Sequence, residues 1–429
     1  MSGEFSIVAD EMRVTVYPSE IHGRLLANPS KSHAQRAIAL AALAPGTSLL
    51  EGIGQSADTR HALAVAAALG AEITGSGNHV SITGGRSLKD SHWHCGESGF
   101  SFRMFSAIAG IYDRQITISA SGSLLSRPNG FVVETLNQMG VDAGPPSGVP
   151  PISIHGPFQN TELELDGSLS SQFLSGLLLA LPNQPKDVVL SVRDLVSVPY
   201  ITMTLETLQA FGISIRHDRY QTFAFHGNQT PTPAQLQIAG DWSGMAFLLV
   251  AGIISGDLIV SGLTHPSAQA DARIMDVLNM SQCTYMQHDR DFRMVQSDPI
   301  AFDFDATHCP DLIPALVPLA LAGRGTSRIN GVHRLRAKES DRAAALISEF
   351  ATLGAHLSVE EDALIIPGGS VHGGVVDAHG DHRIAMALAT AGLRASGPVT
   401  ITGAEHVSKS YPGFFQDLMA LGAQLTIQD

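Results

Sequence analysis

The sequence predicts an α/β protein of two domains, built from six similar units of about 70 residues with three units in each domain. The chain of 429 residues is too long for one ordinary core, and its hydrophobic fraction of 44% is ample for two. Helix-like and strand-like segments also recur along it at a nearly constant spacing. No P-loop, dinucleotide-binding or nucleophile-elbow motif is present, so nucleotide use and hydrolase chemistry lack support.

Each unit is predicted to open with an apolar helix. The helix begins at a polar residue, usually one suited to capping, and ends near a glycine or a Pro-Gly turn. The six first residues are Ser32, Ser101, Ser170, Ser243, Asp311 and Asp381.

A short strand, a second amphipathic helix and two further strands are predicted after each apolar helix. The short strands are expected at Ser48–Leu50, Ile116–Ser119, Val188–Ser191, Leu258–Ser261, Ser327–Asn330 and Val399–Thr402. An alternating strand follows each second helix, for example at Ala71–Thr74 and Ala355–Ser358. The boundary between the domains is expected near residue 240, after the loop-like Asn228–Pro233.

Composition narrows the classes of function. The formal net charge of -14 argues against a nucleic-acid-binding protein, and no apolar run approaches the length that a membrane span needs. The first residues carry acids at Glu4, Asp10 and Glu11 rather than a basic start, so no signal peptide is expected. The 3 cysteines are typical of reduced thiols. We expect a cytoplasmic monomer that acts on small molecules and binds neither nucleic acid nor membrane.

Charged residues recur at two places in the unit, the start of the first helix and the loop that leads into the second. A helix N-terminus offers free backbone N–H groups and binds anions, and arginine grips carboxylate or phosphate with two parallel bonds. If these places converge, they form a pocket for a ligand pair with phosphate and carboxylate groups. The residues are Lys31, Arg36, Arg103, Asp241, Asp311, Asp381, His382 and Arg383 at helix starts, and Arg127, Tyr200, Lys338, Glu339, Arg342 and Lys409 in the loops.

Two long motifs and several short ones carry a specific resemblance. The long motifs are Asn28 to Arg36 with Ala41 to Gly46, and Leu335 to Arg342; the short ones are Gly96 to Arg103, Arg127-Pro128, Ser170-Ser171-Gln172, Ser197 to Tyr200, Pro310-Asp311, Asp381-His382-Arg383 and Lys409. In this order and spacing the chain resembles the 5-enolpyruvylshikimate-3-phosphate synthases over essentially its whole length.

The resemblance implies an inside-out α/β barrel fold with the active site in the cleft between two domains. The first domain would span residues 22–240, and the second residues 1–21 plus 241–429. Each domain would carry only part of the charge cluster, so like charges would face each other across an empty cleft. Bound anions would then draw the halves together. Neither a cofactor nor a metal is implied.

The resemblance also implies roles for individual residues. Phosphoenolpyruvate would contact Lys31, Gly99, Arg127, Gln172, Arg342, Arg383 and Lys409. Shikimate 3-phosphate would contact Lys31, Ser32, Arg36, Ser170, Ser171, Gln172, Ser197, Tyr200, Asp311 and Lys338.

The implied reaction transfers an enolpyruvyl group and releases phosphate. Asp311 would accept the proton of the attacking 5-hydroxyl, and Glu339, assisted by Lys31, would protonate the methylene carbon. Crowded cations would lower the pKa of Asp311 and burial would raise it, and the sequence leaves open which effect prevails.

Some positions depart from the family pattern. Glu97, Ser98 and Phe100 stand in the loop around Gly99 where Asn, Ala and Thr are common, and Met104 replaces a frequent Pro. Arg334 replaces an Asn that contacts the shikimate ligand, and Leu335 replaces a Trp. Sensitivity to glyphosate is therefore open, and our hypothesis is that Phe100 and Met104 alter inhibitor binding more than catalysis.

Four alternatives stay open at this point. UDP-N-acetylglucosamine enolpyruvyl transferases share the fold, but they place a cysteine in the loop before Arg127, and Ser121–Ser126 contains none. The next two alternatives are an enolpyruvyl transferase for another acceptor and a non-catalytic protein that binds phosphorylated ligands. Finally, His92, His94 and Cys95 could hold zinc, although their alternation fits a strand with both histidines on one face.

Overall fold

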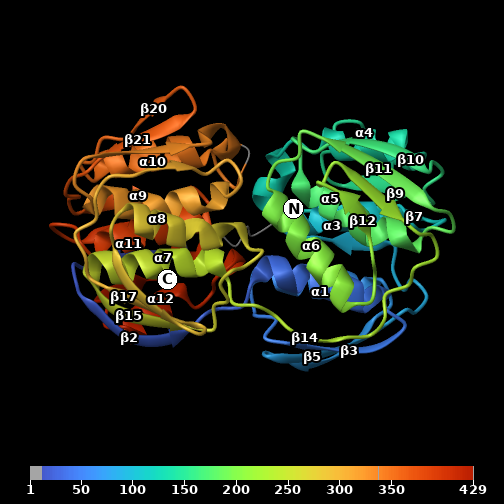
Figure 1. Ribbon diagram of the computed structural model, residues 1–429, viewed down its shortest axis with the longest axis horizontal. Coiled ribbons are helices and arrows are strands. Elements are labelled where there is room, and N and C mark those ends of the chain that lie inside the picture. Colours follow the sequence, from blue (N-terminus) through green and yellow to red (C-terminus); the bar gives the residue numbers. More distant parts are fainter. Residues whose placement is uncertain (1–11, 337, 429) are drawn as a thin grey trace, which may run out of the picture.

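The computed structural model describes residues 12–336 and 338–428. Its two lobes lie side by side, each built from three of the six predicted units (Figure 1). The apolar first helices are confirmed as α1 (Lys31–Leu43), α3 (Gly99–Ala109), α5 (Ser171–Ala180), α7 (Trp242–Ser255), α9 (Ile313–Ala322) and α11 (His382–Gly392). The second helices are α2 (Ala57–Ala68), α4 (Gly130–Gln138), α6 (Val198–Ala210), α8 (Ile274–Met280), α10 (Arg342–Thr352) and α12 (Phe414–Ala420).

The strands form six four-stranded sheets. The six predicted short strands are confirmed within β3 (Gly46–Glu51), β7 (Gln115–Ser119), β11 (Val188–Arg193), β15 (Gly256–Ser261), β19 (Thr326–Asn330) and β23 (Val399–Thr402). The strands after the second helices are β4 (Glu72–Ser76) with β5 (His79–Gly84), β8 (Asp142–Gly144) with β9 (Ile152–His155), β12 (Arg216–Asp218) with β13 (Thr222–Phe225), β16 (Thr284–His288) with β17 (Asp291–Val295), and β20 (Ser358–Glu360) with β21 (Ala363–Pro367). The strand expected at Ala355–Ser358 was placed too early, because β20 begins only at Ser358.

Each sheet also contains a strand that the predicted unit lacked. It pairs parallel to the strand after the first helix. These strands are β2 (Ile21–Leu26), β6 (His92–His94), β10 (Glu162–Asp166), β14 (Gln235–Gln237), β18 (Asp303–Asp305) and β22 (Gly374–Asp377). Several of them have only three residues, too few to establish a period of two in the sequence.

Three sheets join distant parts of the chain. The blue β2 lies beside β15 in the lobe made by the C-terminal half (Figure 1), and β14 pairs with β3 in the other lobe. β1 (Arg13–Val16) lies between β23 and β24 (Leu425–Gln428). The chain therefore crosses between the lobes twice, and Pro29 bridges to Gly240 where the two crossings meet.

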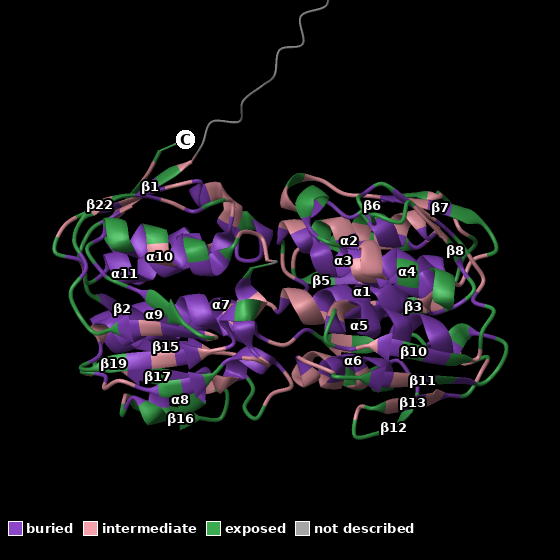
Figure 2. Cartoon of the chain, turned by 90° about the horizontal axis from the view of Figure 1, so that it is seen from above, coloured by how far each residue is buried: buried purple, intermediate pink, exposed green. Residues whose placement is uncertain are grey.

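The apolar first helices lie inside each lobe, as the inside-out arrangement requires, while the second helices are only partly buried. Figure 2 shows α7 and α9 largely purple, hence buried, whereas α4, α8 and α10 also carry green, exposed residues. In α7 every residue except Ser243 is buried, which is the expected state of a helix that is apolar on all sides. No helix in residues 12–336 and 338–428 is long and apolar enough to cross a membrane.

Two separate hydrophobic cores fill the lobes. One comprises buried residues between Ala34 and Ile238, and the other combines Val14–Ala27 with Trp242–Ala423. We propose that these cores are two domains. The boundary predicted at residue 22 falls inside β2, which pairs along its whole length with β15. Of the segment expected to return to the second domain, residues 1–11 lie outside the described residues.

Side-chain caps define where most of the first helices begin. Ser170 accepts a hydrogen bond from the backbone N–H of Phe173, and Asp381 accepts one from that of Arg383, as the sequence predicted. At three other helices the cap lies two or three residues before the predicted start, at Ser30, Ser98 and Asp241. The Pro310–Leu312 segment forms a 3-10 turn, so Asp311 caps no helix.

The close pairing of β2 and β15 depends on Gly256. A Cβ there would lie 1.8 Å from the carbonyl oxygen of Ile21. We expect Gly256→Ala to lower the free energy of unfolding by about 1–3 kcal/mol, because the strands must separate to admit the methyl group. Urea denaturation would measure it. Gly369→Ala is the control, since no atom lies within 4 Å of its Cβ position, and equal stabilities of the two variants would contradict this account.

Candidate active site

A cavity of about 760 Å³ lies between the two lobes. The predicted site residues that line it are Lys31, Ser32, Arg36, Gly99, Arg127, Ser170, Ser171, Gln172, Ser197 and Tyr200 from one lobe, and Asp311, Lys338, Glu339, Arg342 and Arg383 from the other. Lys409 is the one predicted residue outside this lining, and its ammonium lies 3.7 Å from Glu339. The structure thus gathers the whole predicted set in and beside one cleft.

The repeated unit explains why the predicted site residues lie around one cleft. The first turns of α1, α5 and α11 supply Lys31, Ser171 and Arg383, and α3 begins at Gly99. A Cβ at Gly99 would lie 3.0 Å from the Arg127 Nη1 atom, so a side chain there would crowd this guanidinium. The free N–H groups of helix starts therefore face a common space that suits anions.

Arg342 organises the second lobe's side of the cleft. Its side chain is 1% exposed and lies 2.7 Å from Asp311, 2.6 Å from Glu339 and 2.7 Å from Asp381. Burial lowers the pKa of Arg342, but the three carboxylates outweigh burial and raise it. Guanidinium has five N–H donors, and four of them already reach these carboxylates.

Asp311 lies inside a cage of cations. Its carboxylate is 3.0 Å from Lys338, 2.7 Å from Arg342 and 3.5 Å from Arg383. Burial raises the pKa of Asp311, yet these cations prevail and hold it well below the usual value. Of the two effects that the sequence left open, the cations prevail, and the Asp311 carboxylate is ionised.

Glu339 joins the two lobes. One oxygen lies 2.6 Å from Arg342, and the other lies 3.2 Å from Arg127 of the opposite lobe. Burial raises the pKa of Glu339, but Arg342, Arg127 and Lys409 outweigh burial and hold it well below the usual value. The group expected to donate a proton is therefore ionised in this state of the cleft.

A second pair crosses the cleft at Glu97, whose carboxylate lies 3.6 Å from the Lys409 ammonium. Glu97 also accepts hydrogen bonds from the backbone and hydroxyl of Ser123. Glu97–Lys409 and Glu339–Arg127 thus join opposite charges across the cleft, and the expectation that like charges face each other in an empty cleft stays a prediction. The departure from family Asn at position 97 supplies one of those charges.

Arg36 is buried without a carboxylate partner among the described residues. Its guanidinium donates to the Thr204 and Ser175 hydroxyls and to the carbonyl oxygens of Ser32 and Tyr200. Burial lowers the pKa of Arg36 to about 9. A buried cation surrounded by neutral groups is stabilised by an anionic ligand, so Arg36 marks a place for one.

The Phe100 ring lies over this guanidinium, with its centroid 4.2 Å from the Arg36 Cζ atom. Phe100 lines the cleft, whereas Met104 is fully buried in α3 and is not part of the lining. Phe100 could thus touch a bound inhibitor, while Met104 could act only through packing. The hypothesis about glyphosate stays a prediction.

Sequence reasoning missed several cleft residues. Asp58 in α2 is 2.9 Å from the Lys31 ammonium, and only the fold brings them together. Arg103 was noted for its charge but given no role; it donates to the Gln172 side-chain oxygen at 2.8 Å and so orients that amide. Arg334 and His382, which the sequence analysis named without assigning them a ligand, also line the cleft. A single acid such as Asp58 carries no motif that could have identified it.

A buried carboxyl lies behind the cleft. Asp271 is 1% exposed, accepts a hydrogen bond from Ser243 at 2.5 Å and lies 3.9 Å from Arg383. Burial raises the pKa of Asp271 to about 7, with Asp311 adding to the rise and Arg383 opposing it. This carboxyl is therefore largely protonated below neutral pH and adds its negative charge above it.

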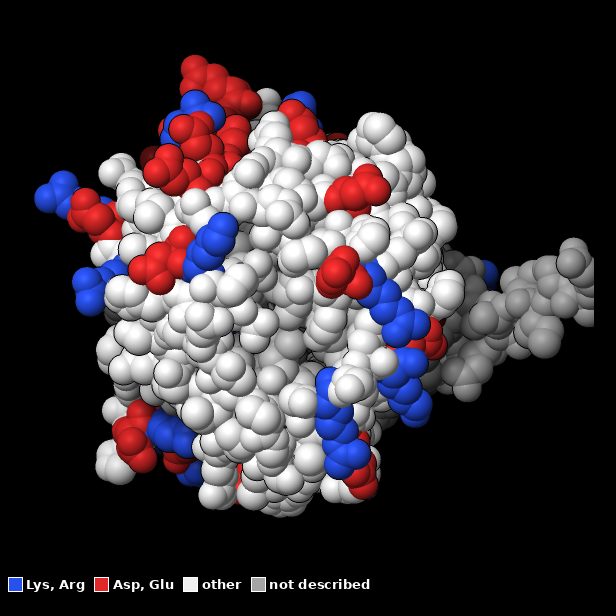
Figure 3. Space-filling model, turned by 90° about the vertical axis from the view of Figure 1, so that its right-hand side faces the viewer, with Lys and Arg blue, Asp and Glu red and all other residues white. Residues whose placement is uncertain are grey.

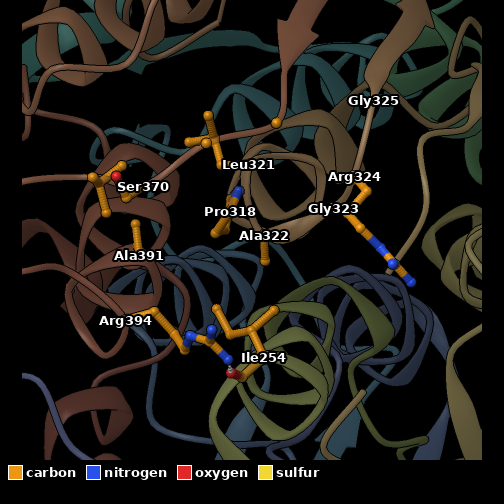
Figure 4. A pocket seen from close by; sticks show the side chains of 13 residues that line it. Ile254, Pro318, Leu321, Ala322, Gly323, Arg324, Gly325, Ser370, Ala391 and Arg394 are labelled. Atoms are coloured by element: carbon orange, nitrogen blue, oxygen red, sulfur yellow. Dashed lines mark hydrogen bonds between the residues drawn. The ribbon is translucent and has the colours of Figure 1, made fainter. Parts of the chain in front are cut away.

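A second cavity, of about 470 Å³, lies where α7, α9 and α11 end. Figure 4 shows Arg394 beside the Ile254 carbonyl oxygen, to which it donates a hydrogen bond at 2.7 Å. This arginine caps carbonyl groups at the end of α7. The lining contains no carboxylate or histidine, so the cavity offers no acid or base.

The residues proposed as zinc ligands lie on β6. His92 and His94 are exposed on either side of the buried Trp93, and Cys95 is buried. His94 contacts the Ser119 hydroxyl at 2.9 Å. In residues 12–336 and 338–428, no three His, Cys, Asp or Glu side chains are grouped so that they could hold a metal.

The cleft has the features of a transferase site for small anions: converging helix starts, unpaired arginines and an ionised carboxylate within a cage of cations. The sequence profile of the family described as EPSP synthase (3-phosphoshikimate 1-carboxyvinyltransferase) matches residues 16–418. The chain belongs to this family.

Relatives and solved structures agree with this assignment. A protein of Aeropyrum pernix named 3-phosphoshikimate 1-carboxyvinyltransferase is 36% identical over 417 residues, covering 96% of each chain. One of the same name from Clostridium kluyveri is 34% identical, covering 96% of this chain and 98% of its own. The structure of EPSP synthase from Acinetobacter baumannii superposes with a TM-score of 0.84 at 25% identity, covering 97% of this chain and all of the other. The predicted fold class is thereby confirmed.

The raised pKa of Asp271 predicts a specific effect of pH on stability. Between its usual 3.8 and about 7 the folded state binds more protons than the unfolded one, so this carboxyl lowers stability as pH rises. Asp271→Asn cannot ionise, so its stability relative to wild type should increase by about 2 kcal/mol from pH 5 to pH 8. Denaturant unfolding at both pH values measures this.

The exposed Asp298 provides the matched control, because Asp298→Asn removes the same charge outside the cleft lining and should show no such trend. A difference between Asp271→Asn and wild type that is the same at pH 5 and pH 8 would rule out a titrating Asp271.

Proposed function

We propose that this chain transfers the enolpyruvyl group of phosphoenolpyruvate to the 5-hydroxyl of shikimate 3-phosphate and releases phosphate. Membership of the EPSP synthase family carries the proposal. The arrangement of Asp311 inside its cage of cations supports it, because the reaction needs an ionised base beside two bound anions.

The acceptor is proposed to lie against the first lobe and to reach Asp311 and Lys338 of the second. Arg36 would receive an anionic group, since it has no carboxylate partner among the described residues. Hydroxyls at the starts of α5 and α6 would bind the rest. The proposed acceptor residues are Lys31, Ser32, Arg36, Ser170, Ser171, Gln172, Ser197, Tyr200, Asp311 and Lys338.

Phosphoenolpyruvate is proposed to lie beside the acceptor, where Gln172 can contact both. The proposed residues are Lys31, Gly99, Arg127, Gln172, Arg342, Arg383 and Lys409. Arg342 has one N–H beyond the four that already reach carboxylates, so Arg127, Arg383 and Lys409 would carry more of the binding.

The proposed reaction is an addition followed by an elimination. Asp311 accepts the proton of the 5-hydroxyl while the oxygen attacks C2 of phosphoenolpyruvate and C3 gains a proton from Glu339 or Lys31. The tetrahedral intermediate then expels phosphate and returns the proton from C3, which restores the double bond. Glu339 must first be protonated, and a ligand anion that draws Arg127 and Lys409 away would raise its pKa.

The protein is further proposed to act as a cytoplasmic monomer on small molecules alone. On the outer face of the first lobe, basic and acidic side chains are interspersed around a broad uncharged area (Figure 3). Such a face lacks the basic patch that nucleic acid or an anionic membrane would need.

The first test is phosphate release from purified protein given both substrates without added metal. Release should require both substrates, and Asp311→Ala should lower kcat by about 10²- to 10⁴-fold, because the general base is lost. The control is Asp142→Ala, which removes an exposed acid of the first lobe and should match wild type.

Full activity in Asp311→Ala would exclude Asp311 as the base. Folded wild-type protein that releases no phosphate would instead point to another acceptor or to a binding protein without activity.

A further inference from the structure

Lys409 is the one proposed phosphoenolpyruvate ligand that does not line the cavity. It ends the 3-10 turn Ala404–Lys409 of the second lobe, and its side chain is 7% exposed. Its ammonium lies between two carboxylates, 3.6 Å from Glu97 and 3.7 Å from Glu339. The buried Nζ atom has no hydrogen-bond partner among the described residues. Charge alone therefore holds this ammonium, and its N–H donors are left for a ligand.

The two carboxylates differ in what else they contact. Glu339 also lies 2.6 Å from Arg342 and 3.2 Å from Arg127, and it has a part in the proposed reaction. Among the described residues, Lys409 is the only cation within 4.0 Å of Glu97. Glu97 has no part in the proposed reaction, so its pairing with Lys409 needs an explanation of its own.

The loop before Arg127 is shaped around the Glu97 carboxylate. Gly122 has a φ of 53°, a conformation that favours glycine, and a Cβ there would collide with this carboxylate. The backbone N–H and the hydroxyl of Ser123 both donate to Glu97 at 3.4 Å. The same hydroxyl accepts a hydrogen bond from Arg127 at 3.2 Å. The loop thus receives the carboxylate in a position from which it reaches Lys409.

We propose that Glu97 competes with phosphoenolpyruvate for Lys409 and so weakens the binding of that substrate. The inference rests on the proposed function and concerns substrate affinity rather than the chemical step. In the empty cleft Glu97 and Glu339 hold the Lys409 ammonium outside the cavity lining. An anionic group of the ligand can pair with Lys409 only when the ammonium leaves Glu97. The lost ion pair then offsets part of the free energy that the new one contributes.

Glu97 could affect binding in the opposite direction, because it belongs to the first lobe and Lys409 to the second. An ion pair that holds the lobes together would favour a closed cleft and so strengthen substrate binding. The two accounts predict opposite changes when the charge of Glu97 is removed. The contacts favour competition, because Glu339 and Arg127 already join the lobes at 3.2 Å, closer than Glu97 and Lys409.

The test measures the KM for phosphoenolpyruvate by phosphate release at saturating shikimate 3-phosphate. Glu97→Gln should lower this KM about two- to tenfold relative to wild type, and the KM for shikimate 3-phosphate should not change. A merely structural role of Glu97 would not lower the KM of one substrate alone. Glu164→Gln is the matched control, because it removes an exposed glutamate of the same lobe outside the cleft lining, and it should match wild type.

A second comparison checks that the effect passes through Lys409. In a Lys409→Met background, Glu97→Gln should no longer lower the KM for phosphoenolpyruvate. An equal fall with and without Lys409 would indicate direct repulsion of the ligand by Glu97 and would overturn the inference.

An unchanged KM in Glu97→Gln would also overturn the inference, and a raised KM would indicate that Glu97 serves to hold the lobes together. If Glu97→Gln melts well below wild type, Glu97→Asn decides, since it carries the amide that is common at this position in the family. Wild type that releases no phosphate would overturn the proposed function, and the inference with it. A result confined to the variants bears on the inference alone.

Discussion

The site depends on one buried guanidinium, that of Arg342. Three carboxylates from different segments, Asp311, Glu339 and Asp381, lie within 2.7 Å of it. Removing one member of such a cluster leaves the others with uncompensated charge in a region shielded from water. The cluster therefore fixes where the Asp311 and Glu339 side chains lie, and Asp381 also caps α11 and so ties that helix to the same point.

The repeated unit makes this concentration of charge possible. Each unit buries an apolar helix and directs the start of that helix toward the space between the lobes, so capping residues and cations of different units arrive together. The 3-10 turns before the second helices then bring side chains such as Arg127, Arg334 and Lys409 to the same space. Glu97 and Glu339 supply opposite charge across the cleft, which lets the lobes touch.

The sequence predicted the units because their period is long and their helices are strongly apolar. At three of the first helices the cap lies two or three residues before the predicted residue, because Ser30, Ser98 and Asp241 compete with nearby polar residues and only the hydrogen bond identifies the cap. Three of the extra strands, β6, β14 and β18, have only three residues and are too short to show a period. Motifs found most of the cleft residues, but Asp58 and Asp271 depend on tertiary contacts alone. The ionised state of Asp311 follows from its distances to three cations. The spacing of residues along the chain does not reveal these distances.

The cations that hold the proposed substrates are the same ones that depress the pKa values of Asp311 and Glu339. A base whose pKa is far below neutral is weak, so Asp311 is a poor proton acceptor while Arg383 and Lys338 act on it alone. Phosphate and carboxylate groups that enter the cleft compensate these cations and raise the pKa of Asp311 toward its usual value. The pKa of Glu339 rises for the same reason when ligand anions compensate Arg127 and Lys409. A higher pKa favours the protonated form of Glu339, which must donate a proton. Substrate binding would thus activate the acid and the base together, and an empty cleft would hold both groups ionised and inactive.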